Sequence, residues 1–192
     1  MQFSDLDLDK TYSYADYLQW QFDERLELIK GKIFKMTPAP NRSHQDVSIN
    51  LTSKLYNFLN NDKCKVYSAP FDVRLPKKSI SDKEVYNVLQ PDICVICDLS
   101  KLDDKGCIGA PDIVVEILSP GNSKKEMSNK FDVYQESGVK EYWIISPIEK
   151  TLTNYILHED GLFYANRPFI EDDLFTTVIL PGFEMKMAEI FE

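Results

Sequence analysis

The stretch GAPDIVVEILSPGNSKKEMSNKFDVYQESGVKEYWIIS (residues 109–146) carries the strongest fold signal in the chain. Its two apolar segments, PDIVVEILSP and EYWIIS, have the composition typical of strands that are buried on both faces. Between them, Pro120-Gly121 ends the first strand, Ser123 can cap a helix to about Ser137, and Gly138 stands where helices often end. A strand, a helix and a strand within about 35 residues predict a crossover unit with parallel strands.

The sequence on either side of this unit extends the α/β pattern. RLELIKGKIFKM predicts two short strands around a Lys30-Gly31 turn, and PDICVICDL predicts another strand. Apolar residues recur at helical spacing from Val47 to Leu59, after Ser43 as a helix cap, whereas the polar residues 76–90 predict a loop. TLTNYILHEDGLFYANRPF predicts a hairpin, followed by a last strand and a short helix. We therefore expect a central mixed β-sheet flanked by helices.

Length and charge narrow the classes of protein to consider. The 192 residues favour a single domain, with an N-terminal helix and hairpin at 1–40, a core at 41–147, and a C-terminal hairpin and helix at 148–192. A net charge of −9 argues against coating by nucleic acid through bulk charge. No run approaches the roughly 20 apolar residues that span a bilayer, and the acidic start is unlike a secretory signal. We expect a cytoplasmic protein without membrane association.

The four cysteines offer little evidence of chemistry. Cys94 and Cys97 form a C-x-x-C motif, which can indicate zinc or redox function. They fall in a predicted strand, however, where residues three apart point to opposite faces. Four cysteines are also too few for the disulfide scaffold of a secreted protein. The cysteines are therefore expected to be structural or incidental.

The carboxylates inside the apolar strands are better candidates, because a buried lone carboxylate is costly. If the two strands are neighbours about 4.8 Å apart, Asp92 and Glu116 can contact one divalent cation. Asp112 lies four residues before Glu116, roughly 13 Å away, so it is expected to start the strand instead. The alternative is that Glu116 pairs with a buried lysine or accepts backbone hydrogen bonds.

Three further residues have both a functional and an ordinary interpretation. Lys130 lies at the edge of the apolar stripe of the predicted helix, where its ammonium either approaches the carboxylates or reaches solvent. Glu27 alternates with Leu26 and Leu28, which by itself favours a solvated side chain. His44 follows the predicted helix cap, where it either binds phosphate or lies on the surface.

Five segments together resemble the Uma-two family, a branch of the PD-(D/E)xK nuclease-like superfamily that is described as restriction endonucleases. They occur in order over most of the chain: LELIKGKIFKMTPAPNRSHQ, PDICVI, GAPDIVVEILSPGNS, NKFDVYQESGVKEYWIISP and LPGFEMKMAEIF. The resemblance implies a restriction-endonuclease-like core with a metal site. The expected activity is that of an endonuclease that hydrolyses DNA phosphodiester bonds with Mg²⁺ or Mn²⁺.

The resemblance also assigns roles to individual residues. Asp92 and Glu116 correspond to the metal-binding acidic residues, and Glu27 to an early catalytic glutamate that binds the metal directly or through water. The superfamily motif places a lysine two residues after the glutamate, where this chain has Leu118. Lys130, on the following helix, is the expected replacement.

Binding partners are indicated less directly by the sequence. Arg42, His44, Lys124 and Lys125 are candidates for contact with nucleic acid. A homodimer is expected because a DNA duplex has two strands to cut. The net charge of −9 keeps a second hypothesis open, in which the fold is a catalytically inactive binding or regulatory module.

Overall fold

The computed structural model describes residues 3–21, 24–36, 41–60, 62–120 and 124–192. Its helices in chain order are a 3₁₀ turn at Phe3–Asp5, α1 (Tyr14–Tyr17), α2 (Arg42–Leu59), a 3₁₀ turn at Leu99–Lys101, α3 (Lys124–Ser137) and α4 (Ala188–Phe191). The first eight strands are β1 (Leu26–Ile29), β2 (Lys32–Lys35), β3 (Lys65–Ser68), β4 (Val73–Arg74), β5 (Val88–Leu89), β6 (Ile93–Ile96), β7 (Leu102–Asp103) and β8 (Gly106–Ile108). The remaining strands are β9 (Ile113–Ile117), β10 (Glu141–Ser146), β11 (Thr151–Leu157), β12 (Phe163–Ala165), β13 (Leu174–Thr176) and β14 (Glu184–Lys186).

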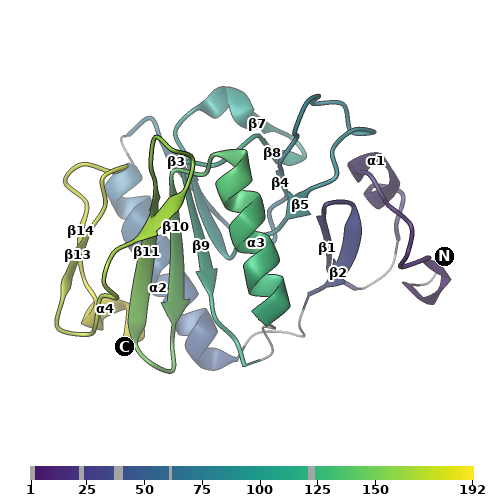
Figure 1. Cartoon of the computed structure of the whole chain (residues 1–192). Coiled ribbons are helices and arrows are strands. Elements are labelled where there is room, and N and C mark those ends of the chain that lie inside the picture. Colours follow the sequence, from purple (N-terminus) through teal and green to yellow (C-terminus); the bar gives the residue numbers. More distant parts are fainter. Residues whose placement is uncertain (1–2, 22–23, 37–40, 61, 121–123) are drawn as a thin grey trace.

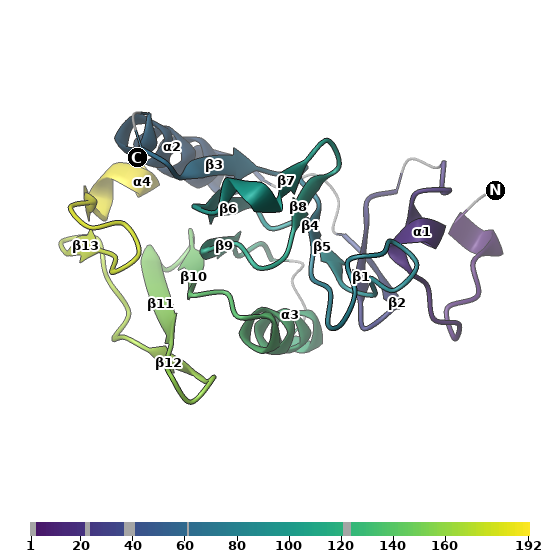
Figure 2. The same cartoon turned by 90° about the horizontal axis from the view of Figure 1, so that it is seen from above.

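A mixed sheet with the strand order β12-β11-β10-β9-β6-β3 forms the centre of the molecule. Strands β9 and β10 are parallel and are joined through α3, which confirms the predicted crossover unit. The other pairings in this sheet are antiparallel. Figure 2 shows α2 on one side of the sheet and α3 on the other, so both faces are covered as expected.

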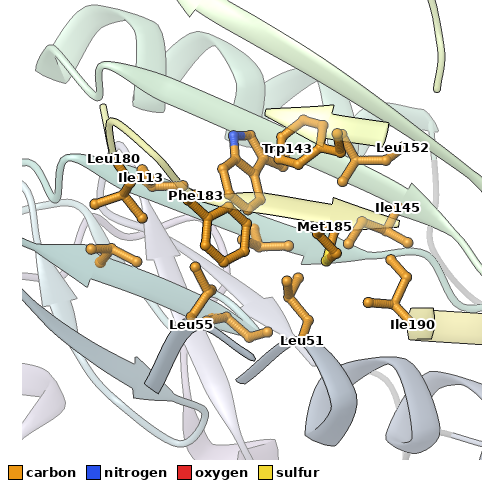
Figure 3. Packing of buried hydrophobic residues seen from close by; sticks show 14 of the residues in the cluster. Leu51, Leu55, Ile113, Trp143, Ile145, Leu152, Leu180, Phe183, Met185 and Ile190 are labelled. Atoms are coloured by element: carbon orange, nitrogen blue, oxygen red, sulfur yellow. The ribbon is translucent and has the colours of Figure 1, made fainter. Parts of the chain in front are cut away.

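Strand β9 explains how the sheet positions a carboxylate inside the protein. Ile113, Val115 and Ile117 pack into the core on the α2 side, whereas Val114 packs into the core on the α3 side. Side chains of a strand alternate between faces, so Glu116 shares the α3 side with Val114. On the α2 side the packing is dense and apolar, as Figure 3 shows for the side chains of β10, α2 and the C-terminal segment.

A second sheet has the strand order β2-β1-β5-β4-β8-β7, and it lies with α1 at one end of the central sheet (Figure 1). The β1–β2 hairpin forms around Lys30-Gly31, both with positive φ, as the sequence predicts. The prediction of a loop over residues 76–90 is wrong at its C-terminal end, because Val88–Leu89 forms β5, which pairs with β1 and β4. This short strand leads through Gln90 and Pro91 directly into Asp92 and β6, so it links the two sheets at the carboxylates.

Two further details differ from the prediction. Asn41, not Ser43, caps α2: its side chain accepts a hydrogen bond from the His44 backbone N–H, and the Ser43 hydroxyl donates to Asn41. Cys64 and Cys97 form a disulfide that joins the residues flanking β3 and β6, which no local pattern indicates. The predicted cap Ser123 lies outside the described residues.

The described part of the chain contains no helix that is long and apolar enough to cross a bilayer. The division of the chain at residues 40 and 147 stays a prediction.

Candidate active site

Asp92 and Glu116 meet across the pair of strands that the sequence predicted to be neighbours. Ile93 of β6 is opposite Val115 of antiparallel β9, which places Asp92 opposite Glu116. The Asp92 Oδ2 atom accepts a hydrogen bond of 2.7 Å from the Ile117 backbone N–H. This bond holds the Asp92 carboxylate against the end of β9. The predicted convergence of these two side chains is therefore confirmed.

Glu27 reaches the same place from the second sheet. Strand β1 pairs with β5, and the backbone N–H of Gln90 donates a 2.9 Å hydrogen bond to Glu27 Oε1. The Glu27 residue is only 1% exposed, so the solvated position suggested by its alternation with Leu26 and Leu28 is wrong. All four residues of β1 are buried, because this strand lies between β2 and β5 and also contacts α3.

Lys130, on α3, contacts both glutamates. Its Nζ lies 3.0 Å from Glu27 Oε1 and 3.1 Å from each carboxylate oxygen of Glu116. Lys130 is 3% exposed, so its side chain does not extend to solvent. Tyr134, one turn later on α3, donates a 2.8 Å hydrogen bond from its hydroxyl to Glu116 Oε1. The alternative in which Glu116 pairs with a buried lysine is thus confirmed, and Glu116 also lies opposite Asp92, whereas a cation shared by these two carboxylates stays a prediction.

The charges in this cluster do not balance. Burial raises the pKa of the Glu116 carboxyl to about 8. The ammonium of Lys130 and the hydroxyl of Tyr134 oppose this rise, whereas the charges of Asp92 and Glu27 add to it. Burial alone would lower the pKa of Lys130, but the two glutamates outweigh it and raise the pKa instead. Two buried carboxyl groups, those of Glu27 and Glu116, contact one ammonium, and the charge of Asp92 also acts on Glu116, so the cluster favours the protonated form of Glu116 when no other cation is present.

A small cavity of about 60 Å³ opens beside these groups. Its lining includes Asp92, Glu116, Lys130 and His44, together with Glu126 from the first turn of α3. His44 is 6% exposed, and its Nε2 lies 3.3 Å from Asp92 Oδ1. The surface position considered for His44 is therefore wrong, because the first turn of α2 directs its imidazole toward the carboxylates.

The donor set fits a magnesium or manganese ion. Mg²⁺ is usually held by one or two carboxylates and several waters, and the cavity offers Asp92 and Glu116 as such a pair. A divalent ion would also replace the proton that burial keeps on Glu116. Within the described ranges, no cluster of three or more His, Cys, Asp or Glu side chains is arranged as a metal cage.

The other candidate residues are not all part of this cluster. Arg42 points outward from the first turn of α2, with a side chain that is 93% exposed and 3.8 Å from Asp46. Lys124 and Lys125 are exposed at the start of α3. Asp112 is buried at the start of β9, where it accepts hydrogen bonds from Lys140 and the Cys97 backbone N–H. This agrees with its predicted role as a strand-start residue.

Sequence reasoning missed three residues that complete the site. Arg25 and Gln90 both line the cavity, and Arg25 Nη2 donates a 2.7 Å hydrogen bond to Gln90 Oε1. Tyr134 is the third, as the partner of Glu116. Spacing could have indicated each one, because Arg25 lies two residues before Glu27, Gln90 two before Asp92, and Tyr134 four after Lys130.

Comparison with known proteins identifies the family. The family described as "Putative restriction endonuclease" (Uma2) matches residues 14–188, which is most of the chain. The chain belongs to the Uma2 family. An uncharacterized protein of Synechocystis sp., slr1290, is 25% identical over 152 residues, covering 78% of this chain and 76% of that protein.

A solved structure shows the same fold as this Uma2 protein. It is described as a "putative nuclease belonging to DUF820" from Anabaena variabilis. The two structures superpose with a TM-score of 0.72, and the match covers 93% of this chain and 97% of the other at 19% identity. The α/β architecture with a restriction-endonuclease-like core, which the sequence predicted, is therefore confirmed.

Proposed function

We propose that this Uma2 protein is a divalent-metal-dependent endonuclease that hydrolyses phosphodiester bonds in DNA. The observation that carries the proposal is the pair of carboxylates, Asp92 and Glu116, on adjacent strands beside the buried ammonium of Lys130. Membership of the Uma2 family supports the reaction class. Under this proposal Asp92 and Glu116 hold Mg²⁺ or Mn²⁺, and Glu27, predicted to bind the metal directly or through water, acts as a positioning residue for Lys130.

The roles of the side chains follow from their positions. A bound divalent ion would supply Lewis-acid stabilisation of the negative charge that develops on the phosphate. Lys130 lines the same cavity, so its ammonium is placed to stabilise charge on a phosphate oxygen or to orient the attacking water. Glu27 fixes Lys130 in that position through its 3.0 Å contact. Tyr134 fixes Glu116 in the same way from the α3 side.

The candidate contacts with nucleic acid lie in the first turns of α2 and α3, close in sequence to His44 and Glu126, which line this cavity. Lys124 and Lys125 at the start of α3, and Arg42 at the start of α2, are exposed and positively charged. We propose that they contact backbone phosphates, which lie beyond the phosphate that is cut. His44 is assigned instead to the site itself, because it contacts Asp92. A homodimer on duplex DNA remains part of the proposal.

The decisive experiment is cleavage of supercoiled and linear DNA in MgCl₂, in MnCl₂ and in EDTA. We expect cleavage in the two metals only, and a loss of at least about 100-fold in Glu116→Gln. Glu136→Gln is the matched control, because Glu136 is exposed on α3 and pairs with Lys30 and Lys77. Undiminished cleavage by folded Glu116→Gln would remove this site from the mechanism. DNA binding without cleavage in any metal would favour the inactive module.

A further inference from the structure

A second cavity of about 280 Å³ adjoins the carboxylate cavity. Arg25, His44 and Asp92 line both cavities, so these three side chains form the wall between them. The larger cavity therefore lies directly beside the proposed metal position. Nothing in the proposed chemistry uses this larger space, so its lining indicates what else binds there.

One face of α2 supplies most of that lining. Gln45, Ser48 and Thr52 are spaced by three and four residues, which puts them on the same side of the helix. Ser68, at the end of β3, also lines the cavity. These side chains offer an amide and three hydroxyls, each of which can donate or accept a hydrogen bond. The lining therefore suits a ligand whose edge carries both donors and acceptors.

Two buried polar atoms at this lining lack a hydrogen-bond partner among the described residues. They are Nδ1 of His44, whose residue is 94% buried, and Oγ1 of Thr52. Buried polar atoms are nearly always satisfied in folded proteins, by protein groups or by bound molecules. Because both atoms are closed off from solvent, they lie behind the surface of the cavity, and the polar side chains that line it carry the argument for a ligand.

Size and charge restrict the class of ligand. A volume of about 280 Å³ is at the lower limit for pockets that hold small molecules, and it suits one ring system. The lining carries one carboxylate, Asp92, and one guanidinium, Arg25, so it favours an uncharged group in this space, whereas the ion proposed in the adjoining cavity attracts an anion. A nucleotide meets both conditions, because its base is an uncharged planar ring and its phosphate is an anion at a short distance.

We propose that this cavity binds the base of an unpaired nucleotide next to the phosphate that is cut. The proposal deepens the endonuclease function and rests on it. A base within an intact duplex is stacked and paired, so it enters such a pocket only after it is turned out of the helix. The enzyme should therefore prefer bulges, flaps or single strands over fully paired DNA.

The test uses three substrates and one pair of matched variants of the full chain. The substrates are a fully paired duplex, the same duplex with one unpaired 2-aminopurine nucleotide, and the corresponding single strand. Ser48→Trp fills the cavity from α2, whereas Ser53→Trp places the same side chain on the exposed face of that helix. Cleavage is measured in MnCl₂, and binding is measured by 2-aminopurine fluorescence in EDTA.

We expect the wild type to cleave the unpaired substrates about tenfold faster than the paired duplex. Ser48→Trp should abolish this preference and the fluorescence change, and Ser53→Trp should keep both. Equal cleavage of all three substrates by the wild type would overturn the pocket assignment and leave the nuclease intact. A fluorescence change lost only in Ser48→Trp, without cleavage of any substrate, would support the pocket and reject the nuclease. Neither binding nor cleavage would overturn both.

Discussion

Replacement of Lys130 with Met tests the buried charge cluster most sharply. Methionine has a similar length and keeps the apolar packing of the lysine stem, but it removes the ammonium that lies 3.0–3.1 Å from Glu27 and Glu116. Removal of one partner from a buried ion pair costs about 3–5 kcal/mol, because the other charge remains buried without compensation. For a chain of this size that loss corresponds to a fall in melting temperature of roughly 6–20 °C.

The loss should depend on pH in a defined direction. The folded-state pKa of Glu116 is raised to about 8, above its unfolded value, so wild-type stability falls as pH rises from the unfolded value toward 8 and then levels off. Lys130 restrains this rise. Without Lys130 the pKa of Glu116 is higher still, and the stability of the variant continues to fall above pH 8. The difference between the two proteins should therefore be larger at pH 9 than at pH 6.

The assay is urea denaturation at both pH values, with Lys125→Met as the control. Lys125 is exposed on the same helix, and its replacement should change stability by less than about 0.5 kcal/mol. A loss below about 1 kcal/mol in Lys130→Met, with no dependence on pH, would show that the ammonium is not buried between the two glutamates.

Three further predictions concern the metal, Tyr134 and the C-terminal segment. Mn²⁺ affinity should rise with pH through about 8, because the ion displaces the proton of Glu116; calorimetry that gives equal affinity at pH 6 and pH 9 would contradict this. Tyr134→Phe removes the hydrogen bond to Glu116 and should lower the free energy of unfolding by about 1–3 kcal/mol, measured by urea denaturation, whereas no change would mean that the bond is absent. Glu141 is fully buried and accepts hydrogen bonds from Trp143 Nε1, the Thr177 hydroxyl and nearby backbone N–H groups. Glu141→Ala should therefore accelerate amide hydrogen exchange around Thr177 more than in β1, and a uniform change would argue against a local anchor.

The central part of the fold could be predicted because its signals are local. The Val- and Ile-rich strands around Glu116 and Asp92 are too apolar for an exposed position, and the helix between β9 and β10 favours a parallel pairing of these strands. Their adjacency then brings the two carboxylates together by strand spacing alone. The position of Lys130 at the edge of the apolar stripe of α3 could also be predicted from the sequence, whereas the burial of its side chain could not.

The remaining features depend on contacts between distant segments. Glu27 is buried because β1 pairs with β5, a two-residue strand within a polar stretch about 60 residues later, and such a strand has no pattern of its own. His44 reaches Asp92 because Asn41 caps α2 at its N-terminus, which places His44 in the first turn of the helix within 3.3 Å of the Asp92 carboxylate. The Cys64–Cys97 disulfide follows from the pairing of β3 with β6. Each of these contacts requires the sheet to be assembled first.

The most direct test of the account is a crystal structure of the wild-type protein grown with MnCl₂, with anomalous scattering recorded at the manganese edge. We expect one strong peak between the carboxylates of Asp92 and Glu116, and its loss in Glu116→Gln. A peak at other residues, or no peak in crystals of protein that cleaves DNA in the same MnCl₂ solution, would contradict it.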